Sequence, residues 1–93
     1  MTIEYNENTL QQIEQLASIF LPITDIAAIL DIPAEVLRMD IANKKTDASK
    51  RYHKGKAASR VKLLHQEMQL AYVGSPLALE NAQKNLMAME DDE

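Results

Sequence analysis

Apolar residues recur along this chain at intervals of three and four, the spacing that places side chains on one face of an α-helix. The pattern predicts a first helix from Asn8 or Thr9 to about Phe20, ended by Pro22. Its apolar stripe consists of Leu10, Ile13, Leu16, Ala17 and Phe20. No run of alternating β-branched and polar residues stands out, so the sequence predicts an all-α protein.

Two short helices are predicted within residues 21–45. Thr24 is expected to cap the first by accepting a hydrogen bond from a backbone N–H. Pro33 is expected to open the second, where a missing N–H costs little. Asp31 and Ile32 form the turn, in which Asp replaces the Gly of many such turns but tolerates the left-handed conformation better than most residues. Two short helices and a tight turn are typical of a helix-turn-helix.

The second of these helices has an inner and an outer face. The inner face is apolar and consists of Ile32, Val36, Leu37 and Ile41. The outer face consists of Glu35, Arg38, Ala42 and Lys45. Arg38 is the best candidate for reading a base, because a guanidinium can donate two hydrogen bonds to guanine, while Glu35 can accept one from cytosine. With the first helix, this pair predicts a three-helix unit over residues 1–46.

A long helix, capped by Thr46 or Asp47, is predicted to reach Tyr72 or Val73. Its first half is polar almost all round, so we expect it to stay unburied. Gly55 is expected to mark a kink, a break or a close contact between helices. The second half carries an apolar surface wider than one intrachain contact needs: Ala57, Val61, Leu63, Leu64, Met68, Leu70, Ala71 and Tyr72.

A last helix is predicted to begin with a left-handed Gly74, an N-cap at Ser75 and Pro76 in the first turn. It extends to about Met89 with the stripe Leu79, Ala82, Leu86 and Met89. The acidic residues 90–93 are expected to be disordered. We expect residues 47–93 to form an antiparallel helix pair that self-associates. The predicted oligomerisation residues are Val61, Leu64, Met68, Leu70, Tyr72, Leu79 and Leu86.

The charge is distributed unevenly along the chain. The net charge is −4, yet eight of the ten Lys and Arg residues lie between Lys44 and Lys62, with Asp47 as the only acid among them. These eight residues, Lys44, Lys45, Lys50, Arg51, Lys54, Lys56, Arg60 and Lys62, can neutralise phosphates and release counterions. A solvated linker is the alternative interpretation of this segment. Local potential matters more for binding than net charge, so double-stranded DNA is the predicted partner.

Other chemistry finds little support in the sequence. There is no Cys, which excludes disulfides and thiolate metal sites. His53 and His65 are on different faces of one helix and cannot ligate a metal together. No carboxylate pair, phosphate loop or nucleophile–base arrangement appears. We therefore expect no enzyme activity, cofactor, metal or small-molecule substrate. The chain shows neither a signal peptide nor a membrane span, so we expect a cytoplasmic protein.

Several runs together resemble one known family. The run at residues 26–37, Ile-Ala-Ala-Ile-Leu-Asp-Ile-Pro-Ala-Glu-Val-Leu, is similar to the helix-turn-helix of bacteriophage terminase small subunits and related homeodomain-like phage proteins. Downstream runs at residues 52–57, 63–64 and 71–78 follow in the same order as in that family. The resemblance implies a non-enzymatic DNA-binding subunit. It also implies assembly through the C-terminal helices, often as a ring, and delivery of DNA to a motor-nuclease, the terminase large subunit.

Two other interpretations remain open. A small prophage transcription regulator would use the same helix-turn-helix. A helical protein-interaction or oligomerisation module would not bind DNA at all, because helical hairpins are common in proteins that do not touch nucleic acid. Salt distinguishes a DNA-binding protein from an interaction module. Phosphate contacts weaken steeply with ionic strength, whereas apolar association of helices does not.

Overall fold

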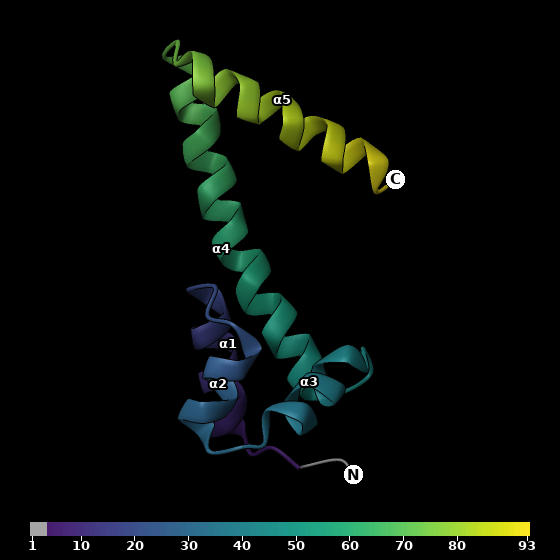
Figure 1. The fold of residues 1–93 in the computed structure, drawn as a ribbon. Coiled ribbons are helices and arrows are strands. Elements are labelled where there is room, and N and C mark those ends of the chain that lie inside the picture. Colours follow the sequence, from purple (N-terminus) through teal and green to yellow (C-terminus); the bar gives the residue numbers. More distant parts are fainter. Residues whose placement is uncertain (1–3) are drawn as a thin grey trace. The chain divides into compact units, whose positions relative to one another are not determined.

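The computed structural model describes residues 4–93, and within them it contains five α-helices and no strand (Figure 1). The helices are α1 (Glu7–Ser18), α2 (Ile23–Leu30), α3 (Ala34–Ala42), α4 (Asp47–Tyr72) and α5 (Pro76–Asp91). The prediction of an all-α fold, three helices followed by two, is confirmed. The chain divides into two compact units, Met1–Ser59 and Arg60–Glu93, at a point inside α4 and further along than residue 46.

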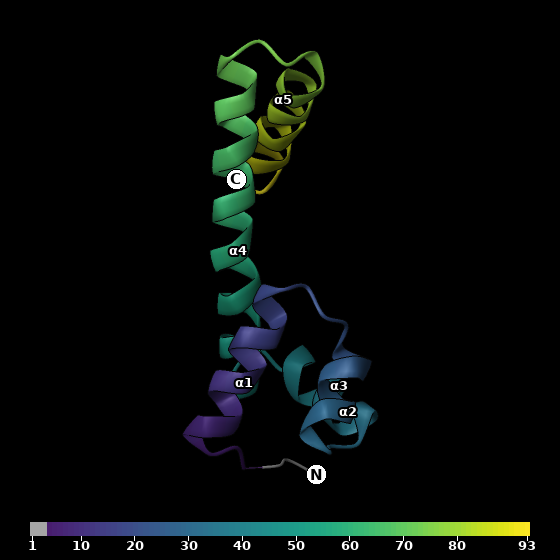
Figure 2. The ribbon, with the colours of Figure 1, turned by 90° about the vertical axis from the view of Figure 1, so that its left-hand side faces the viewer.

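The first unit is built on one apolar core shared by α1, α2, α3 and the beginning of α4. Figure 2 shows α1 lying along this first part of α4. The buried core residues are Leu10, Ile13, Ala17, Ile26, Ala27, Leu37, Ile41, Ala48 and Tyr52. The core residues on α1, α2 and α3 are the positions predicted by the apolar periodicity. The apolar pattern therefore determines most of the core.

The helix α1 ends earlier than predicted. Asn6 caps its beginning, where the Asn6 Oδ1 accepts a hydrogen bond from the Thr9 N–H at 2.8 Å. After Ser18 the chain makes a Schellman turn, in which the Leu21 N–H donates to the Leu16 carbonyl. Phe20 takes the left-handed position of this turn (φ 60°) and is 49% exposed. Its assignment to the α1 stripe was therefore wrong, because the turn carries its side chain away from the core.

The beginning of α4 is buried, contrary to the expectation from its polar sequence. Ala48, Ser49, Tyr52 and Gly55 are buried against the rest of the first unit. Most of these residues are small, so the inner face is narrow and the charged residues beside it still reach solvent. Thr46 caps the helix as predicted, with its Oγ1 accepting from the Ser49 N–H at 3.1 Å.

Gly55 is the point of closest approach between α4 and α1. A Cβ built on Gly55 would lie 2.1 Å from the carbonyl oxygen of Glu14, which is backbone and cannot rotate away. Next to this contact, the Ser59 hydroxyl donates to the Ser18 carbonyl. Of the three roles expected for Gly55, the structure shows the close helix contact.

We expect Gly55→Ala to destabilise the protein by about 1–3 kcal/mol, because the added methyl group forces the two helices apart. Helix propensity alone predicts the opposite effect, an increase of about 1 kcal/mol in the free energy of unfolding. Urea unfolding followed by circular dichroism distinguishes the two. Gln66→Ala, at an exposed position of the same helix, is the control and should change stability by less than about 0.5 kcal/mol. A stabilised Gly55→Ala variant would contradict this packing.

A buried hydrogen bond holds the inner side of α3. Asp40 is 4% exposed, and its Oδ2 accepts a hydrogen bond from the Tyr5 hydroxyl at 2.7 Å. Burial, the hydrogen bond to Asp40 and the charge of Asp40 all raise the pKa of Tyr5 above its ordinary value. The Asp40 carbonyl also accepts from the Thr46 hydroxyl at 2.6 Å. The segment before α1 and the turn after α3 are both attached to α3 in this way.

The second unit consists of the rest of α4, a turn and α5. Gly74 is left-handed (φ 94°), and the Ser75 side chain accepts from the Ala78 N–H, as predicted. Figure 1 shows α5 leaving this turn at a wide angle to α4. The acidic tail, expected to be disordered, begins inside α5. The helix α5 extends to Asp91, and the Asp92 N–H donates to the Ala88 carbonyl, so the helical bonding continues through the first acidic residues.

Candidate nucleic-acid interface

The helices α2 and α3 form a helix-turn-helix arrangement. Asp31 adopts the left-handed conformation (φ 59°, ψ 42°), which Asp tolerates better than most residues. The Ile32 N–H donates to the Ala27 carbonyl at 2.9 Å, and Ala27 is almost fully buried. This turn lets Leu37 and Ile41 pack into the core shared with α2. The outer side of α3 is left to solvent.

Thr24 does not cap α2. The N-cap position is Pro22, two residues earlier, and it makes no side-chain hydrogen bond. The Thr24 hydroxyl lies in the first turn of the helix, and its Oγ1 accepts a hydrogen bond from the Arg38 Nη2 at 3.0 Å. The prediction of a Thr24 cap was therefore wrong, and the hydroxyl instead connects α2 to the outer face of α3.

The outer face of α3 has the composition expected from the sequence, with one addition. Glu35, Arg38 and Ala42 are all exposed. Met39 lies at the edge of the same face, beside Glu35, and is 67% exposed. Met39 was not among the predicted site residues, although its position four residues after Glu35 and three before Ala42 places it there. Lys45 lies beyond the end of α3, in the turn that leads to α4.

Four lysines form the basic segment next to α3: Lys44, Lys45, Lys50 and Lys54. All four are exposed. Within residues 4–93 none of them forms an ion pair. Lys44 and Lys45 lie in the turn after α3, and Lys50 and Lys54 are one turn apart on α4. Their ammonium groups are therefore available to an anion, with Asp47 as the acid among them in sequence.

The remaining predicted basic residues have other surroundings. Arg51 points to α1, where its Nε lies 2.7 Å from Glu14 Oε1 and its Nη1 lies 2.8 Å from Glu7 Oε1. Hydrogen bonds to Glu7 and then to Glu14 raise the pKa of Arg51. Lys56 is exposed, with its Nζ 5.1 Å from the centre of the buried Tyr52 ring. Arg60 belongs to the second unit.

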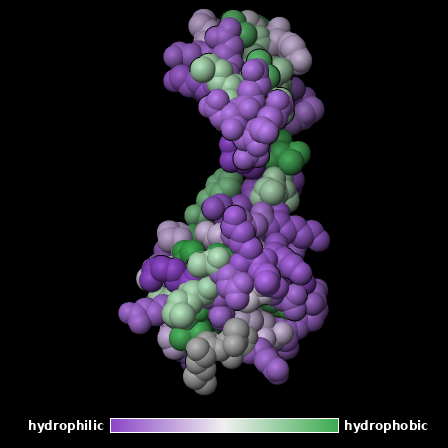
Figure 3. All heavy atoms as spheres, turned by 90° about the vertical axis from the view of Figure 1, so that its right-hand side faces the viewer, coloured by the Kyte–Doolittle hydropathy of each residue, from purple (hydrophilic) through white to green (hydrophobic). Residues whose placement is uncertain are grey.

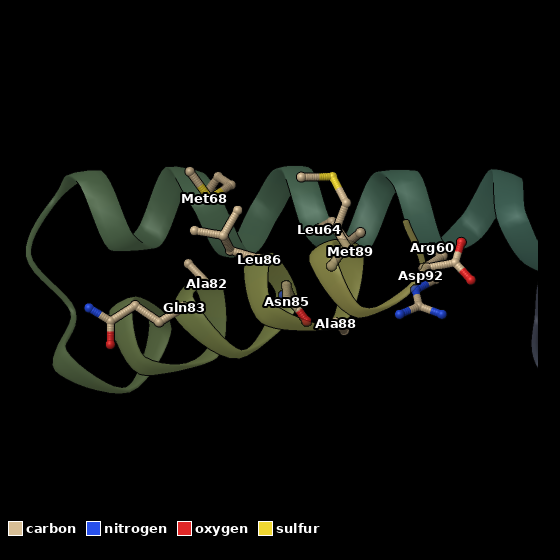
Figure 4. A pocket seen from close by; sticks show the side chains of 10 residues that line it. All are labelled: Arg60, Leu64, Met68, Ala82, Gln83, Asn85, Leu86, Ala88, Met89 and Asp92. Carbon is tan, nitrogen blue, oxygen red and sulfur yellow. The ribbon is translucent and has the colours of Figure 1, made fainter.

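The second unit buries very little apolar surface. Within residues 60–93, Ala78 is the single fully buried apolar residue. An open cleft of about 770 Å³ lies between α4 and α5 (Figure 4). Its apolar lining comes from Leu64, Met68, Ala82, Leu86, Ala88 and Met89. Figure 3 shows further apolar atoms at the surface. Four other predicted oligomerisation residues lie outside the cleft lining and are 51–79% exposed: Val61, Leu70, Tyr72 and Leu79.

The described residues offer little other chemistry. No group of three or more His, Asp or Glu residues among residues 4–93 could hold a metal ion. His53 Nδ1 lies 2.9 Å from the Ser49 carbonyl oxygen, and His65 Nε2 lies 3.3 Å from the Gln69 amide, so each is engaged locally. None of the helices in the described part of the chain is both long enough and apolar enough to cross a membrane.

The fold and the site together define an all-α protein with a helix-turn-helix pair, an adjoining lysine segment and an open C-terminal helix pair. Comparison with protein-family models, with curated proteins and with solved structures finds no match.

Proposed function

We propose that this protein binds double-stranded DNA through the outer face of α3 and the lysine segment that follows it. The observation that carries the proposal is the set of four exposed, unpaired lysines, Lys44, Lys45, Lys50 and Lys54, in the same compact unit as the helix-turn-helix. Flexible ammonium groups of this kind neutralise phosphates without needing a fixed geometry. The net charge of −4 does not oppose this, because the acids lie mainly outside the segment.

The two parts of the interface have different roles in this proposal. Phosphate contacts from the lysines fix the position of the protein on the duplex but carry no sequence information. The α3 face, which contains Glu35, Arg38, Met39 and Ala42, enters the major groove and contacts base edges. Arg51 is left out of the interface, because it forms two ion pairs with α1.

The resemblance of residues 22–86 to terminase small subunits supports a role in phage or prophage DNA packaging. In that role the protein is a cytoplasmic, non-enzymatic subunit that assembles with copies of itself through α4 and α5. It recognises DNA and passes it to a larger motor-nuclease, the terminase large subunit. The thinly covered apolar surface of the second unit is the observation that favours assembly.

Two alternatives use the same observations differently. A prophage transcription regulator would make the same DNA contacts, so the neighbouring genes separate it from a packaging protein. A protein-interaction module would use only the open C-terminal unit, and its α3 face would have no nucleic-acid ligand. The Arg38→Ala variant of α3 distinguishes the protein-interaction module from both DNA-binding functions.

Arg38→Ala is expected to weaken binding to a preferred duplex by about 1–3 kcal/mol, because it removes a donor that pairs with a base edge. Binding to an unrelated duplex should change little. Fluorescence anisotropy of the full chain on a duplex enriched from a random library gives both values. Lys84→Ala on α5 is the control, since it removes one positive charge outside the interface. Equal weakening on both duplexes would make Arg38 a phosphate contact, and absence of all duplex binding would refute the proposed function.

A further inference from the structure

The outer α3 face carries two exposed apolar residues. Met39 is 67% exposed, and Ala42, one turn further on, is also exposed. Neither side chain can donate a hydrogen bond to a base edge. The surface that these two residues present is therefore carbon and sulfur.

The polar members of the face are Arg38, at the edge opposite Met39, and Glu35, between Met39 and Ala42. Arg38 is attached through its Nη2 to the Thr24 hydroxyl of α2 at 3.0 Å. This hydrogen bond directs the guanidinium toward α2 and leaves the Met39 side open. Glu35, one turn before Met39, adds a negative charge that is unfavourable near phosphates but can accept a hydrogen bond from cytosine. Hydrogen-bonding readout on this face is thus limited to Arg38 and Glu35.

We propose that Met39, together with Ala42, contacts the C5-methyl group of a thymine in the major groove. This inference rests on the proposed function and names the base that the α3 face selects. The thymine methyl is the one apolar group that the four natural bases present in the major groove, and it is the group that apolar side chains contact there. Lys44 and Lys45, which directly follow α3, would hold the phosphates on either side. The negative charge of the duplex therefore suits the lysines next to Met39 and Ala42, whereas an apolar protein partner gains nothing from these lysines.

The test replaces thymine by uracil, which removes only the methyl group. A duplex is enriched from a random library with the full chain, and each thymine in it is then changed singly to uracil. We expect at least one position where this change weakens binding of the unmodified protein about fourfold, the equivalent of burying one methyl-sized group. At that position Met39→Ala should bind the thymine and uracil duplexes equally. Met39→Leu, which keeps an apolar side chain, should still prefer thymine.

Ile29→Ala is the matched control, because Ile29 is similarly exposed, at 61%, but lies on α2. It should keep the full preference for thymine. The inference is overturned if no uracil substitution matters, or if the loss persists in Met39→Ala, although the protein still binds DNA. It is also overturned if Met39→Ala alters self-association and not DNA binding, since Met39 is then a protein contact. If no duplex is bound at about 50 mM salt, the proposed function itself fails and the inference falls with it.

Discussion

Replacement of Lys44, Lys45, Lys50 and Lys54 together by Ala is expected to weaken binding to every DNA sequence and to flatten its dependence on salt. Each phosphate contact contributes about 0.9 to the slope of log affinity against log salt. The loss of all four contacts should therefore shrink the difference in affinity between about 50 and 200 mM salt by about a hundredfold. Fluorescence anisotropy on an unrelated duplex at a series of salt concentrations measures this slope.

The matched control replaces the same four lysines by Arg, which keeps the charges and should keep the slope. Arg51→Ala is a second comparison. Because Arg51 is paired with Glu7 and Glu14, its removal should lower the stability of the first unit and leave the salt slope of the folded protein nearly unchanged. A quadruple Ala variant that binds as tightly as the parent, with the same slope, would show that the lysine segment is a solvated surface and not an interface.

Leu64→Asp combined with Leu86→Asp is expected to abolish self-association. Both side chains line the open cleft of the second unit, from α4 and α5 respectively (Figure 4). In an assembled protein this surface is covered by another copy, and a carboxylate there would have to be buried without a partner, which costs several kcal/mol or more. Light scattering at micromolar protein concentration should show an oligomer for the parent and a monomer for the double variant.

Gln69→Glu controls for the added charge, because Gln69 is exposed and does not line the cleft. It should leave the oligomer intact. Circular dichroism of both variants separates loss of assembly from loss of helix. If the parent protein is a monomer at these concentrations, the apolar surface of the second unit is not a contact between copies, and the ring-like assembly that the family resemblance implies is excluded.

Local pattern was sufficient to predict most of the first unit. The spacing of Leu10, Ile13 and Ala17 identified the buried face of α1, and that of Leu37 and Ile41 did the same for α3. These are single-helix properties, so periodicity reveals them directly. The turn chemistry at Asp31 and Gly74 was predictable for the same reason, since a left-handed residue after a helix needs a side chain that tolerates positive φ.

The misses at α4 and Thr24 involve contacts between different elements, whereas the miss at Phe20 depends on a local turn. The face of α4 formed by Ala48, Tyr52 and Gly55 is too narrow to stand out in a charged helix, and it is recognisable only once α1 lies against it. Phe20 matched the α1 stripe, but the Schellman turn after Ser18 took precedence over periodicity. Thr24 looked like a cap because Thr often is one. The helix begins one residue before Thr24, so the Thr24 hydroxyl lies inside the first turn and accepts from Arg38 instead.

The candidate site was predictable as a composition but not as an arrangement. Charge counting selected Lys44, Lys45, Lys50 and Lys54 together with Arg51, and nothing local distinguishes that one arginine from the lysines. Arg51 differs from the lysines because it pairs with Glu14, which is distant in sequence. In the structure the Arg51 Nε lies 2.7 Å from Glu14 Oε1. Met39 could have been found from the sequence by completing the outer face of α3, since exposed methionine between Glu35 and Ala42 follows from helix geometry alone.

The central claim, that this protein binds duplex DNA through several phosphate contacts, is tested most directly by the salt dependence of the unmodified full chain. Its affinity for a duplex is measured from about 50 to 200 mM salt. With four lysines in contact, the affinity should fall by about a hundredfold or more over this range. Absence of binding at the lowest salt, or an affinity that hardly changes across the series, would contradict the claim.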